Sequence, residues 1–244
     1  RDSLGLKREI ISKNHSISIG FDIEQAGRRQ FDFSSLTYYA EHTSDRTALL
    51  TLFPIGNVTR ANLFTYRDMD DPWLRQMRAA PQETLFALMP ALREMAGEFS
   101  VSGQIKIRPI DLYVTHGHRQ PGVVLVGDAF ATSCPAAGTG ARKVLTDVER
   151  LCNAHIPEWL QSDGMSAGKI AAFYDDPIKQ ACDLFSIRKA YGLKAFSIDT
   201  GLSWRLRRWV KFAVHLVRGM LRRFEHHEPS PGRDAIAAAP HKPA

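Results

Sequence analysis

The chain has 244 residues, 44% of them hydrophobic and 24% charged, a composition typical of a globular protein. No apolar run approaches the roughly 20 residues of a membrane-spanning helix. The three cysteines, Cys134, Cys152 and Cys182, form no CxxC pair, which argues against a disulfide framework or a structural zinc site. No signal peptide is recognisable at the start, so we expect a cytoplasmic protein. Basic residues outnumber acidic ones by 32 to 26, and the excess lies between residues 188 and 225, where ten Lys and Arg accompany two acids.

The first part of the chain is predicted to form an antiparallel sheet. The stretch HSISIGFDI alternates apolar and polar residues, as a half-buried strand does. Three further stretches, SSLTYYAEH, TALLTLFPIG and TRANLFTYR, follow with Asp, Gly and Asn turn residues between them. These patterns predict strands from about Ser16 to Arg67.

Two helices are predicted next. Asp70 or Asp71 can cap the first, which has Pro72 in its first turn. Pro81 begins the second, which is expected to run without interruption to Gly97. Its apolar face is made of Leu85, Leu88, Leu92 and Met95.

Two more strands, at 103–115 and 122–128, are predicted before a helical region. The second strand is a continuous apolar run, typical of a strand buried on both faces. After Gly140 the pattern is helical nearly to Phe224, and breaks are expected near Pro157, Gly164, Pro177 and Gly201. Residues 226–244 are rich in Pro, Ala and Gly, and we expect them to be disordered.

The segment VVLVGDAFATSCPAAGTGARKVLTDVERL, residues 123–151, carries the clearest functional signal. The predicted strand brings Gly127 and Asp128 to its carboxyl end, where ligands bind in α/β folds. The Asp128 carboxylate can accept hydrogen bonds from hydroxyls. Gly138 and Gly140 expose backbone N–H groups at the start of the next helix, where anions are attracted. This pattern favours a ligand with both a polyol and a group that becomes negative; the alternative is a plain strand–loop–helix connection.

The same segment resembles the second flavin-binding motif of the FAD-dependent aromatic-hydroxylase-like monooxygenases. That pattern is roughly GDAAH, three residues, Pro, two residues, then GxGxNxGxxDAxxL. The positions in register are Gly127, Asp128, Ala129, Pro135, Gly138, Gly140, Asp147 and Leu151. The opening RDS resembles the end of the family's DG motif, and the family's N-terminal GxGxxG segment is missing. The resemblance therefore implies that the natural protein extends upstream.

The resemblance also implies which residues bind the cofactor: Gly127, Asp128, Pro135, Gly138, Thr139, Gly140, Ala141 and Arg142. Asp128 would hydrogen-bond the ribityl hydroxyls of FAD, and Pro135 would lie beside the isoalloxazine ring. The N–H groups of residues 138–140 would face the N1/C2 edge of the flavin, which is anionic when reduced.

Three positions depart from the family pattern. Ala131 stands where the family often has His, Arg142 where it has Asn, and Val144 where it has Gly. Arg142 is either a positive charge near the reduced flavin or an arginine on a solvated helix face. Val144 puts the packing of the helix in question.

The resemblance implies an α/β (α+β) fold, a truncated form of the FAD/NAD(P)-binding flavoprotein hydroxylase fold. Residues 1–120 would form a β-rich substrate-domain region with two helices. Residues 121–200 would hold the second half of the FAD-binding domain plus helices, 201–225 a basic amphipathic helix, and 226–244 the disordered tail. The substrate would lie over the sheet. Tyr39 and Phe53 are candidate substrate contacts, although aromatic residues on strands more often serve packing.

The activity implied by the resemblance is that of an FAD-dependent monooxygenase. NAD(P)H and O2 would be used to hydroxylate or oxidise an organic substrate, for which a lipophilic molecule is one candidate. No side chain stands out as an acid or base catalyst, consistent with a cofactor that carries the chemistry. Two alternatives stay open: a flavin-dependent reductase or dehydrogenase acting on a prenyl or lipid-like substrate, and a non-catalytic membrane-associated protein with a degenerate flavin site.

Two smaller motifs receive structural interpretations. The stretch THGHR holds His116 and His118 two residues apart, and we expect a loop there and no metal site. Cys134, beside Pro135, is either a small residue that fills the loop or a redox-active thiol.

The stretch WRLRRWVKFAVHLVRGMLRRF, residues 204–224, predicts an amphipathic helix with a basic polar face. Its apolar positions are Leu206, Trp209, Val210, Ala213, Leu216, Val217, Met220 and Leu221. Such a helix can attach to a membrane surface, which would make the protein peripheral on the inner face of the membrane. The alternative is a helix docked on its own protein or on a partner subunit. We do not expect nucleic-acid binding, because no recognised nucleic-acid-binding fold accompanies the basic stretch.

Overall fold

The structure is a computed structural model that describes residues 2–25 and 31–225. The chain divides into two compact units, Arg1–Asp199 and Thr200–Ala244, and each is described here by itself. The predicted mixture of helices and an antiparallel sheet is confirmed. The proposed division near residue 120 stays a prediction, and the tail at 226–244 lies outside the described residues.

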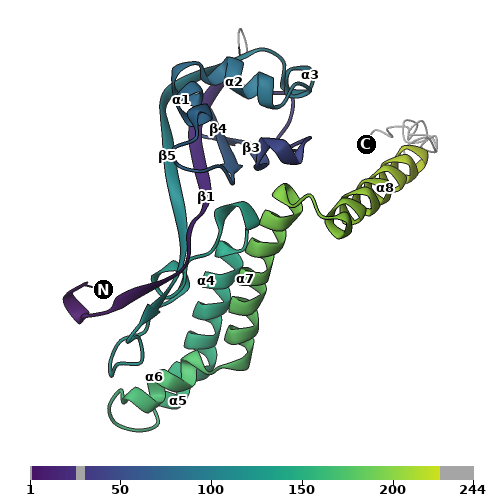
Figure 1. The fold of residues 1–244 in the computed structure, drawn as a ribbon. Coiled ribbons are helices and arrows are strands. Elements are labelled where there is room, and N and C mark those ends of the chain that lie inside the picture. Colours follow the sequence, from purple (N-terminus) through teal and green to yellow (C-terminus); the bar gives the residue numbers. More distant parts are fainter. Residues whose placement is uncertain (1, 26–30, 226–244) are drawn as a thin grey trace, which may run out of the picture. The chain divides into compact units, whose positions relative to one another are not determined.

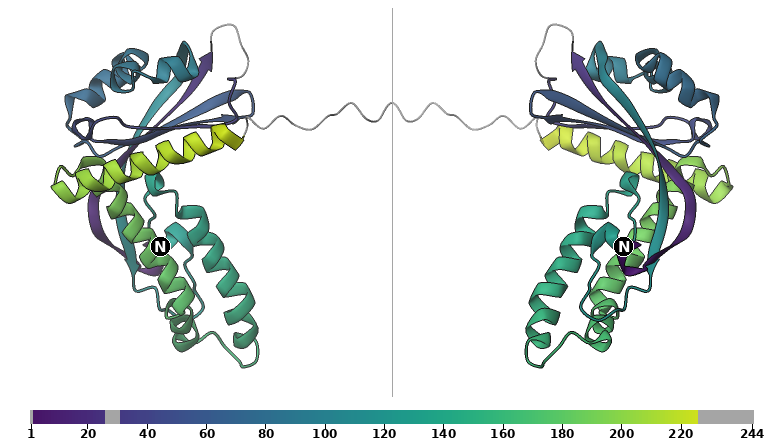
Figure 2. Two further views of the ribbon diagram at one scale, coloured as in Figure 1. Left: turned by 90° about the vertical axis from the view of Figure 1, so that its right-hand side faces the viewer. Right: turned by 90° about the vertical axis from the view of Figure 1, so that its left-hand side faces the viewer.

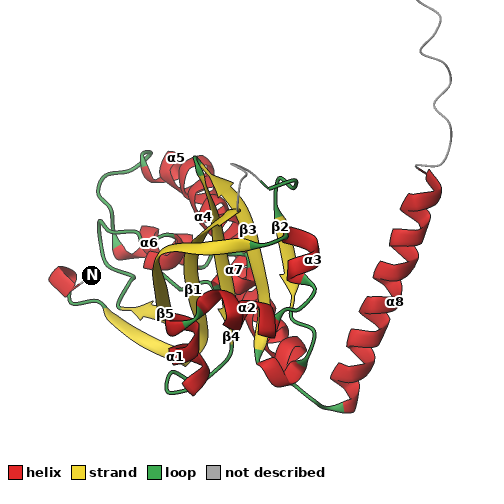
Figure 3. Ribbon diagram, turned by 90° about the horizontal axis from the view of Figure 1, so that it is seen from above, coloured by secondary structure: helices red, strands yellow, loops and turns green. Residues whose placement is uncertain are grey.

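A five-stranded antiparallel sheet organises the first unit, with the strand order β2-β3-β4-β1-β5 (Figures 1 and 3). The strands are β1 (Lys7–Gln25), β2 (Leu36–Tyr39), β3 (Thr47–Ile55), β4 (Val58–Thr65) and β5 (Phe99–His116). The predicted strands are thus confirmed, and in β1 the buried residues alternate along the strand from Ile17 to Ile23. The strand expected at 103–115 is longer than predicted and pairs with β1.

The β1–β5 pair runs far beyond the rest of the sheet and contains irregular steps. Its register shifts between Ser12 and Ser16, where Asn14 has a φ of 47° and its N–H donates to the Asp111 carboxylate at 2.7 Å. β1 has two more residues than β5 between the pairs Ser12–Leu112 and Ser16–Ile110, and such a bulge changes the direction of the neighbouring side chains. His15 follows it and is fully buried.

Three helices cover one face of the sheet (Figure 2). They are α1 (Pro72–Ala79), α2 (Pro81–Leu88) and α3 (Leu92–Ala96). The Asp71 carboxylate accepts the Trp73 N–H at 2.9 Å, so Asp71 is the cap of α1. The core beneath these helices combines alternate residues of the strands with helix side chains: Ile17, Ile19, Phe21, Leu50, Leu52, Leu63, Leu74, Met77, Leu85 and Leu92.

The single helix expected from Pro81 to Gly97 is wrong in two respects. The chain breaks between α2 and α3 because Pro90 has no N–H to donate and its ring obstructs a continuous helix. The break changes the direction of the second part. Leu85, Leu88 and Leu92 are buried as predicted, but Met95 is 53% exposed.

A helical layer follows the loop that ends at Thr139. It comprises α4 (Gly140–Arg150), a π-helical turn (Leu151–His155), α5 (Ile156–Trp159), α6 (Ala167–Tyr174) and α7 (Pro177–Ile198). The breaks predicted near Gly164 and Pro177 are present, but none occurs at Pro157. The helix instead widens into the π turn just before Pro157, one way to absorb the missing proline N–H. α4 and α7 pack side by side (Figure 1).

The buried strand predicted at 122–128 is wrong. Residues 123–126 have no strand partner within the described part of the chain, and Gly127–Ala129 form a 3₁₀ turn. A single bridge joins Val114 to Ala131 at this edge. The Tyr174 hydroxyl takes the place of a neighbouring strand, because it accepts the Leu125 N–H at 2.7 Å and donates to the Leu125 carbonyl. The apolar run reflects packing of Val124 and Val126 on a helical cluster.

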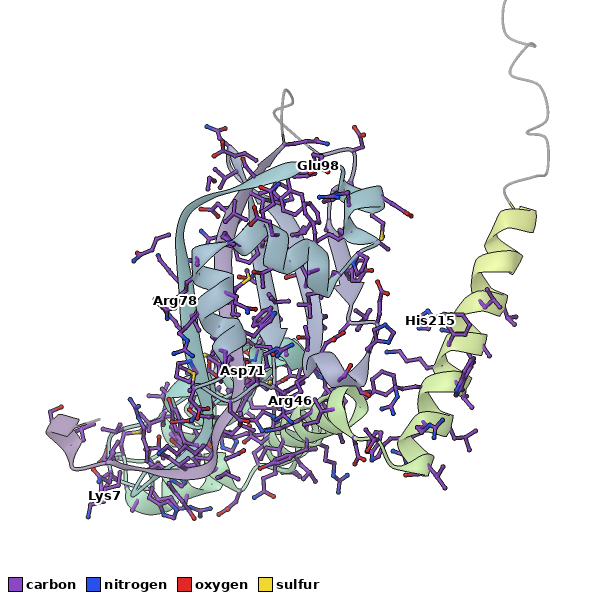
Figure 4. The ribbon with its side chains drawn as sticks, turned by 45° about the horizontal axis from the view of Figure 1, so that its top comes forward. Lys7, Arg46, Asp71, Arg78, Glu98 and His215 are labelled. Carbon is purple, nitrogen blue, oxygen red and sulfur yellow. The ribbon has the colours of Figure 1, made fainter. Side chains whose placement is uncertain are left out.

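The second unit contains α8 (Leu202–Glu225), which begins after the predicted break at Gly201. Figure 4 draws the side chains along this helix and labels His215 among them. Within residues 2–25 and 31–225, no helix is long and apolar enough to cross a membrane.

Candidate functional site

The loop from Gly127 to Thr139 is the last part of the connection between β5 and α4, and with the start of α4 it contains the residues predicted to bind a ligand. Asp128 lies in its first 3₁₀ turn and is exposed. Its Oδ1 accepts the Ser133 N–H at 2.9 Å, and its backbone carbonyl accepts the Tyr113 hydroxyl at 2.9 Å. The first bond orients the carboxylate and the second holds the backbone of the turn, and the exposed side chain stays accessible to a ligand hydroxyl.

Gly127 is held tightly behind Asp128. Its N–H donates to Asp147 Oδ2 at 2.8 Å, and its φ is 54°, in the left-handed region. A Cβ added there would lie 3.2 Å from both Cβ and Cγ2 of Val144 on α4. Val144, one of the three departures from the family pattern, therefore packs directly over this turn and makes a larger residue at position 127 unfavourable.

A buried ionic cluster supports the loop from below, and sequence reasoning missed it. Lys143 is 2% exposed, and its Nζ donates to the Ala131 carbonyl at 2.6 Å. Lys179 is fully buried and lies 3.3 Å from Asp147 Oδ1 and 2.8 Å from Asp183 Oδ2. The two lysines and two aspartates balance in charge, as buried ions must.

The signal for this cluster was present in the sequence. Lys143 and Asp147, like Lys179 and Asp183, are spaced i,i+4 on a helix, which puts each pair on one face. From helical periodicity alone, such charged pairs would be placed on the solvent-exposed face of the helix. Only the packing of α4 against α7 shows that both pairs face inward.

The N-terminus of α4 is not capped by the residue that precedes it. Thr139 occupies the cap position, but its hydroxyl makes no cap hydrogen bond and instead lies 2.7 Å from Ser186 Oγ on α7. The first N–H groups of a helix have no partner within the helix. The N–H groups of Gly140 and Ala141 are therefore available to an acceptor, and the helix end favours a negative one.

The other predicted residues lie around this helix end. Pro135 and Gly138 are exposed, and Gly138 has a φ of 65° with nothing within 4 Å of an added Cβ. Ala141 and Arg142 are also exposed. The Arg142 guanidinium lies 4.7 Å from the ring centroid of Phe185 on α7, a cation–π contact. Along one loop, the structure thus brings together the carboxylate, the open helix end and the exposed Pro and Gly backbone.

Behind the loop lies a second group of buried polar residues that the sequence analysis did not single out. Cys134 is 1% exposed, and its Sγ lies 3.7 Å from Ser16 Oγ, which favours the interpretation of Cys134 as a packing residue. Nearby, His15 Nε2 and the Tyr66 hydroxyl are buried and have no hydrogen-bond partner among the residues that the structure describes. Burial, with the positive charge of Lys194, lowers the pKa of His15, and burial raises the pKa of Tyr66.

The two candidate substrate contacts share one face of the sheet. The register pairs Tyr39 with Leu49, so Tyr39 and Phe53 both point away from the face that α1–α3 cover. Tyr39 is 52% exposed and Phe53 half-buried. They are separated by the four residues from 49 to 53 along β3, roughly 13 Å, too far to contact the same small group. The Asp22–Arg60 ion pair, at 2.6 Å, borders the same face.

The two histidines of THGHR make separate contacts. His116 pairs with Glu9 on β1. The His118 ring contacts the rings of both Phe130 and Tyr174, at centroid distances of 4.9 and 4.3 Å, and burial lowers the pKa of His118. His118 therefore helps to pack the Phe130 end of the loop.

No protein-family model matches the chain, and no curated protein sequence matches it. Its fold, however, is that of part of the flavin-dependent monooxygenases and halogenases. One similar structure is p-nitrophenol 4-monooxygenase PnpA from Pseudomonas putida DLL-E4, with a TM-score of 0.59 and 16% identity over 91% of this chain and 54% of that one.

Two more similar structures show the range of proteins that share this fold. The Diels–Alderase PyrE3 of pyrroindomycin biosynthesis has a TM-score of 0.58 and 13% identity, over 89% of this chain and 44% of that one. A mutant of halogenase PltM in complex with FAD has a TM-score of 0.55 and 12% identity, over 93% and 48%. The chain thus spans about half the length of these structures, and at such identities the similarity establishes the fold alone.

Proposed function

We propose that the chain forms part of an FAD-dependent monooxygenase, with the FAD site at residues 127–142. The observation that carries the proposal is the pairing, along one loop, of an oriented and exposed Asp128 carboxylate with the uncapped N-terminus of α4. A carboxylate accepts hydrogen bonds from the hydroxyls of a ribityl chain, and a helix N-terminus stabilises negative charge. FAD needs both.

Each predicted residue has a role in this proposal. Gly127 turns the chain so that Asp128 faces the ligand, and the exposed Pro135 and Gly138 allow the flavin ring to approach the backbone. The N–H groups of Gly140 and Ala141 bind the ring edge that is negative in the reduced cofactor. Thr139 leaves those groups open because its hydroxyl pairs with Ser186.

When bound, FAD would accept hydride from NAD(P)H and activate O2 for the oxidation of an organic substrate. The half-buried sheet face that carries Tyr39 and Phe53 is the proposed substrate side. The protein's own part is to orient the cofactor, to exclude water and to hold the substrate near it. The chain's similarity to structures named as a monooxygenase, a halogenase and a Diels–Alderase means that the reaction must be established by assay.

The test is a titration of the protein, expressed with any natural sequence that precedes Arg1, with FAD and followed by visible absorbance. We expect flavin bands in the protein fraction. Asp128→Asn keeps an acceptor for the Ser133 N–H but replaces the second carboxylate oxygen with an amide donor. It should weaken FAD binding by about 10- to 100-fold, the value of a hydrogen bond to a charged group. Asp163→Ala, which removes an exposed aspartate from the 160–166 loop, is the matched control.

A folded protein that stays colourless with excess FAD would contradict the proposal and favour the non-catalytic alternative. If flavin binds, measuring oxygen uptake distinguishes the monooxygenase from the flavin-dependent reductase. A monooxygenase consumes O2 and NAD(P)H in step with the substrate, whereas a flavin-dependent reductase acting on a prenyl or lipid-like substrate proceeds without oxygen.

A further inference from the structure

The helix α8 leaves a continuous apolar stripe exposed to solvent. Seven apolar residues of α8 are between 49% and 81% exposed, and Phe212 is one of them. The other six form the stripe: Leu202, Leu206, Trp209, Val210, Leu216 and Val217. At 100° per residue they fall within an arc of about 120° on the helix surface. Single exposed apolar residues are common, but a row that extends over four turns indicates a surface that binds something.

The rest of the helix surface is basic. Residues 202–219 contain five Lys and Arg and no Asp or Glu, and all five cations lie outside the apolar arc. The Arg207 guanidinium lies 4.7 Å from the ring centroid of Trp204, a cation–π contact. The apolar stripe is therefore flanked by positive charge on both sides.

This charge distribution decides between possible occupants. If two copies of the chain paired their apolar stripes, they would also bring two rows of cations together, and residues 202–219 supply no Asp or Glu between them. An anionic lipid surface has the opposite properties, because its interior takes the apolar stripe while its headgroups pair with the flanking cations. Tryptophan and arginine are both favoured at the headgroup level.

We propose that α8 binds in the plane of an anionic lipid bilayer, with the stripe inserted and Arg205, Arg207 and Arg218 at the headgroups. The proposal is independent of the flavin site, and its test requires no cofactor. For a cytoplasmic protein the target would be the anionic inner leaflet.

The experiment is co-sedimentation of the full chain with vesicles of phosphatidylcholine, with and without 30% phosphatidylserine, at about 0.1 M salt. We expect binding to the anionic vesicles that weakens strongly in 0.5 M salt, where charges are screened within a few ångströms. Each Lys or Arg near such a surface changes the affinity by about fivefold, so the Arg205→Gln, Arg207→Gln, Arg218→Gln triple variant should lose about 100-fold.

Two further variants make the test specific. Trp209→Glu with Leu216→Glu should abolish binding, because it places charge in the stripe while the basic residues stay. The control removes the same charge from the first unit through Arg75→Gln, Arg78→Gln and Lys106→Gln, three exposed positions, and should bind like wild type.

Three results would overturn the proposal. One is equal binding, or none, to both kinds of vesicle. Another is an equal loss of binding in the control, which would mean that general basic charge is responsible. The third is a dimer in the absence of lipid that the Glu substitutions dissociate, which would assign the stripe to chain–chain contact. Circular dichroism of each variant establishes that the helix and the first unit are intact.

Discussion

Substitution of Gly127 by alanine tests the geometry at the base of the proposed flavin loop. The backbone there has a φ of 54°, which costs an L-residue about 1 kcal/mol relative to glycine. The new methyl group would also lie 3.2 Å from Cβ and Cγ2 of Val144, and neither atom is at the end of a flexible side chain. Overpacking of this kind costs about 1–3 kcal/mol.

The two contributions together predict that Gly127→Ala lowers the free energy of unfolding by about 2–4 kcal/mol. The lower backbone entropy of alanine in the unfolded chain offsets about 0.5 kcal/mol of that loss. Urea unfolding, followed by far-UV circular dichroism, measures the change. The FAD titration described above reports whether the loop still binds cofactor.

A double-mutant cycle with Val144→Gly separates the two contributions, because glycine at position 144 removes both contacting atoms. In that background Gly127→Ala should cost only the backbone contribution of about 1 kcal/mol. Gly164→Ala is the matched control, since Gly164 has a φ of 73° and open space around an added Cβ, and it too should cost about 1 kcal/mol. An equal cost of Gly127→Ala in both backgrounds would refute the Val144 contact.

Three further predictions concern buried polar groups. Burial opposes ionisation of Asp176, but hydrogen bonds from Arg150 and from the first turn of α7 outweigh it and lower its pKa from 3.8 to about 2. Because the pKa of Asp176 is lower in the folded than in the unfolded state, its carboxylate contributes about 2 kcal/mol of stability, which is present above pH 4 and is lost as pH falls toward 2. Asp176→Asn should therefore lower the free energy of unfolding by that amount at pH 7 and remove this acid dependence, as urea unfolding at several pH values would measure. Tyr66→Phe should leave the free energy of unfolding unchanged or raise it by about 1 kcal/mol, because the hydroxyl is buried without a partner, and a loss of stability in urea would reveal a missed partner. Lys179→Met should cost about 3–5 kcal/mol by leaving the buried carboxylates short of a cation, and adding Asp183→Asn should recover part of that loss; no recovery would mean that the charges act independently.

Local signals in the sequence were sufficient for most of the first unit. Alternation of apolar residues predicted the antiparallel sheet. An aspartate at position 70 or 71, with Pro72, predicted the start of α1, because a cap and a fixed φ act within a few residues; the structure shows that Asp71 is the cap. The start of α4 near Gly140 and the amphipathic pattern of α8 were likewise readable from spacing alone.

Pairing and burial were not readable in this way. A strand exists only where another strand supplies hydrogen bonds, so the apolar run at 123–126 could not reveal that the Tyr174 hydroxyl would bind it instead. The buried ionic cluster had the same ambiguity, because a Lys and an Asp four residues apart look alike on a solvated face and on an interior one.

The amino-acid sequence by itself determined the residues of the candidate site and their order along the loop, because turns, caps and helix starts depend on near neighbours. The tertiary structure alone decided that Thr139 turns to Ser186 and leaves the end of α4 open, and that Val144 packs over Gly127. Those contacts join residues up to 47 positions apart in the chain, and only the packing of α7 against α4 and the loop brings such residues together.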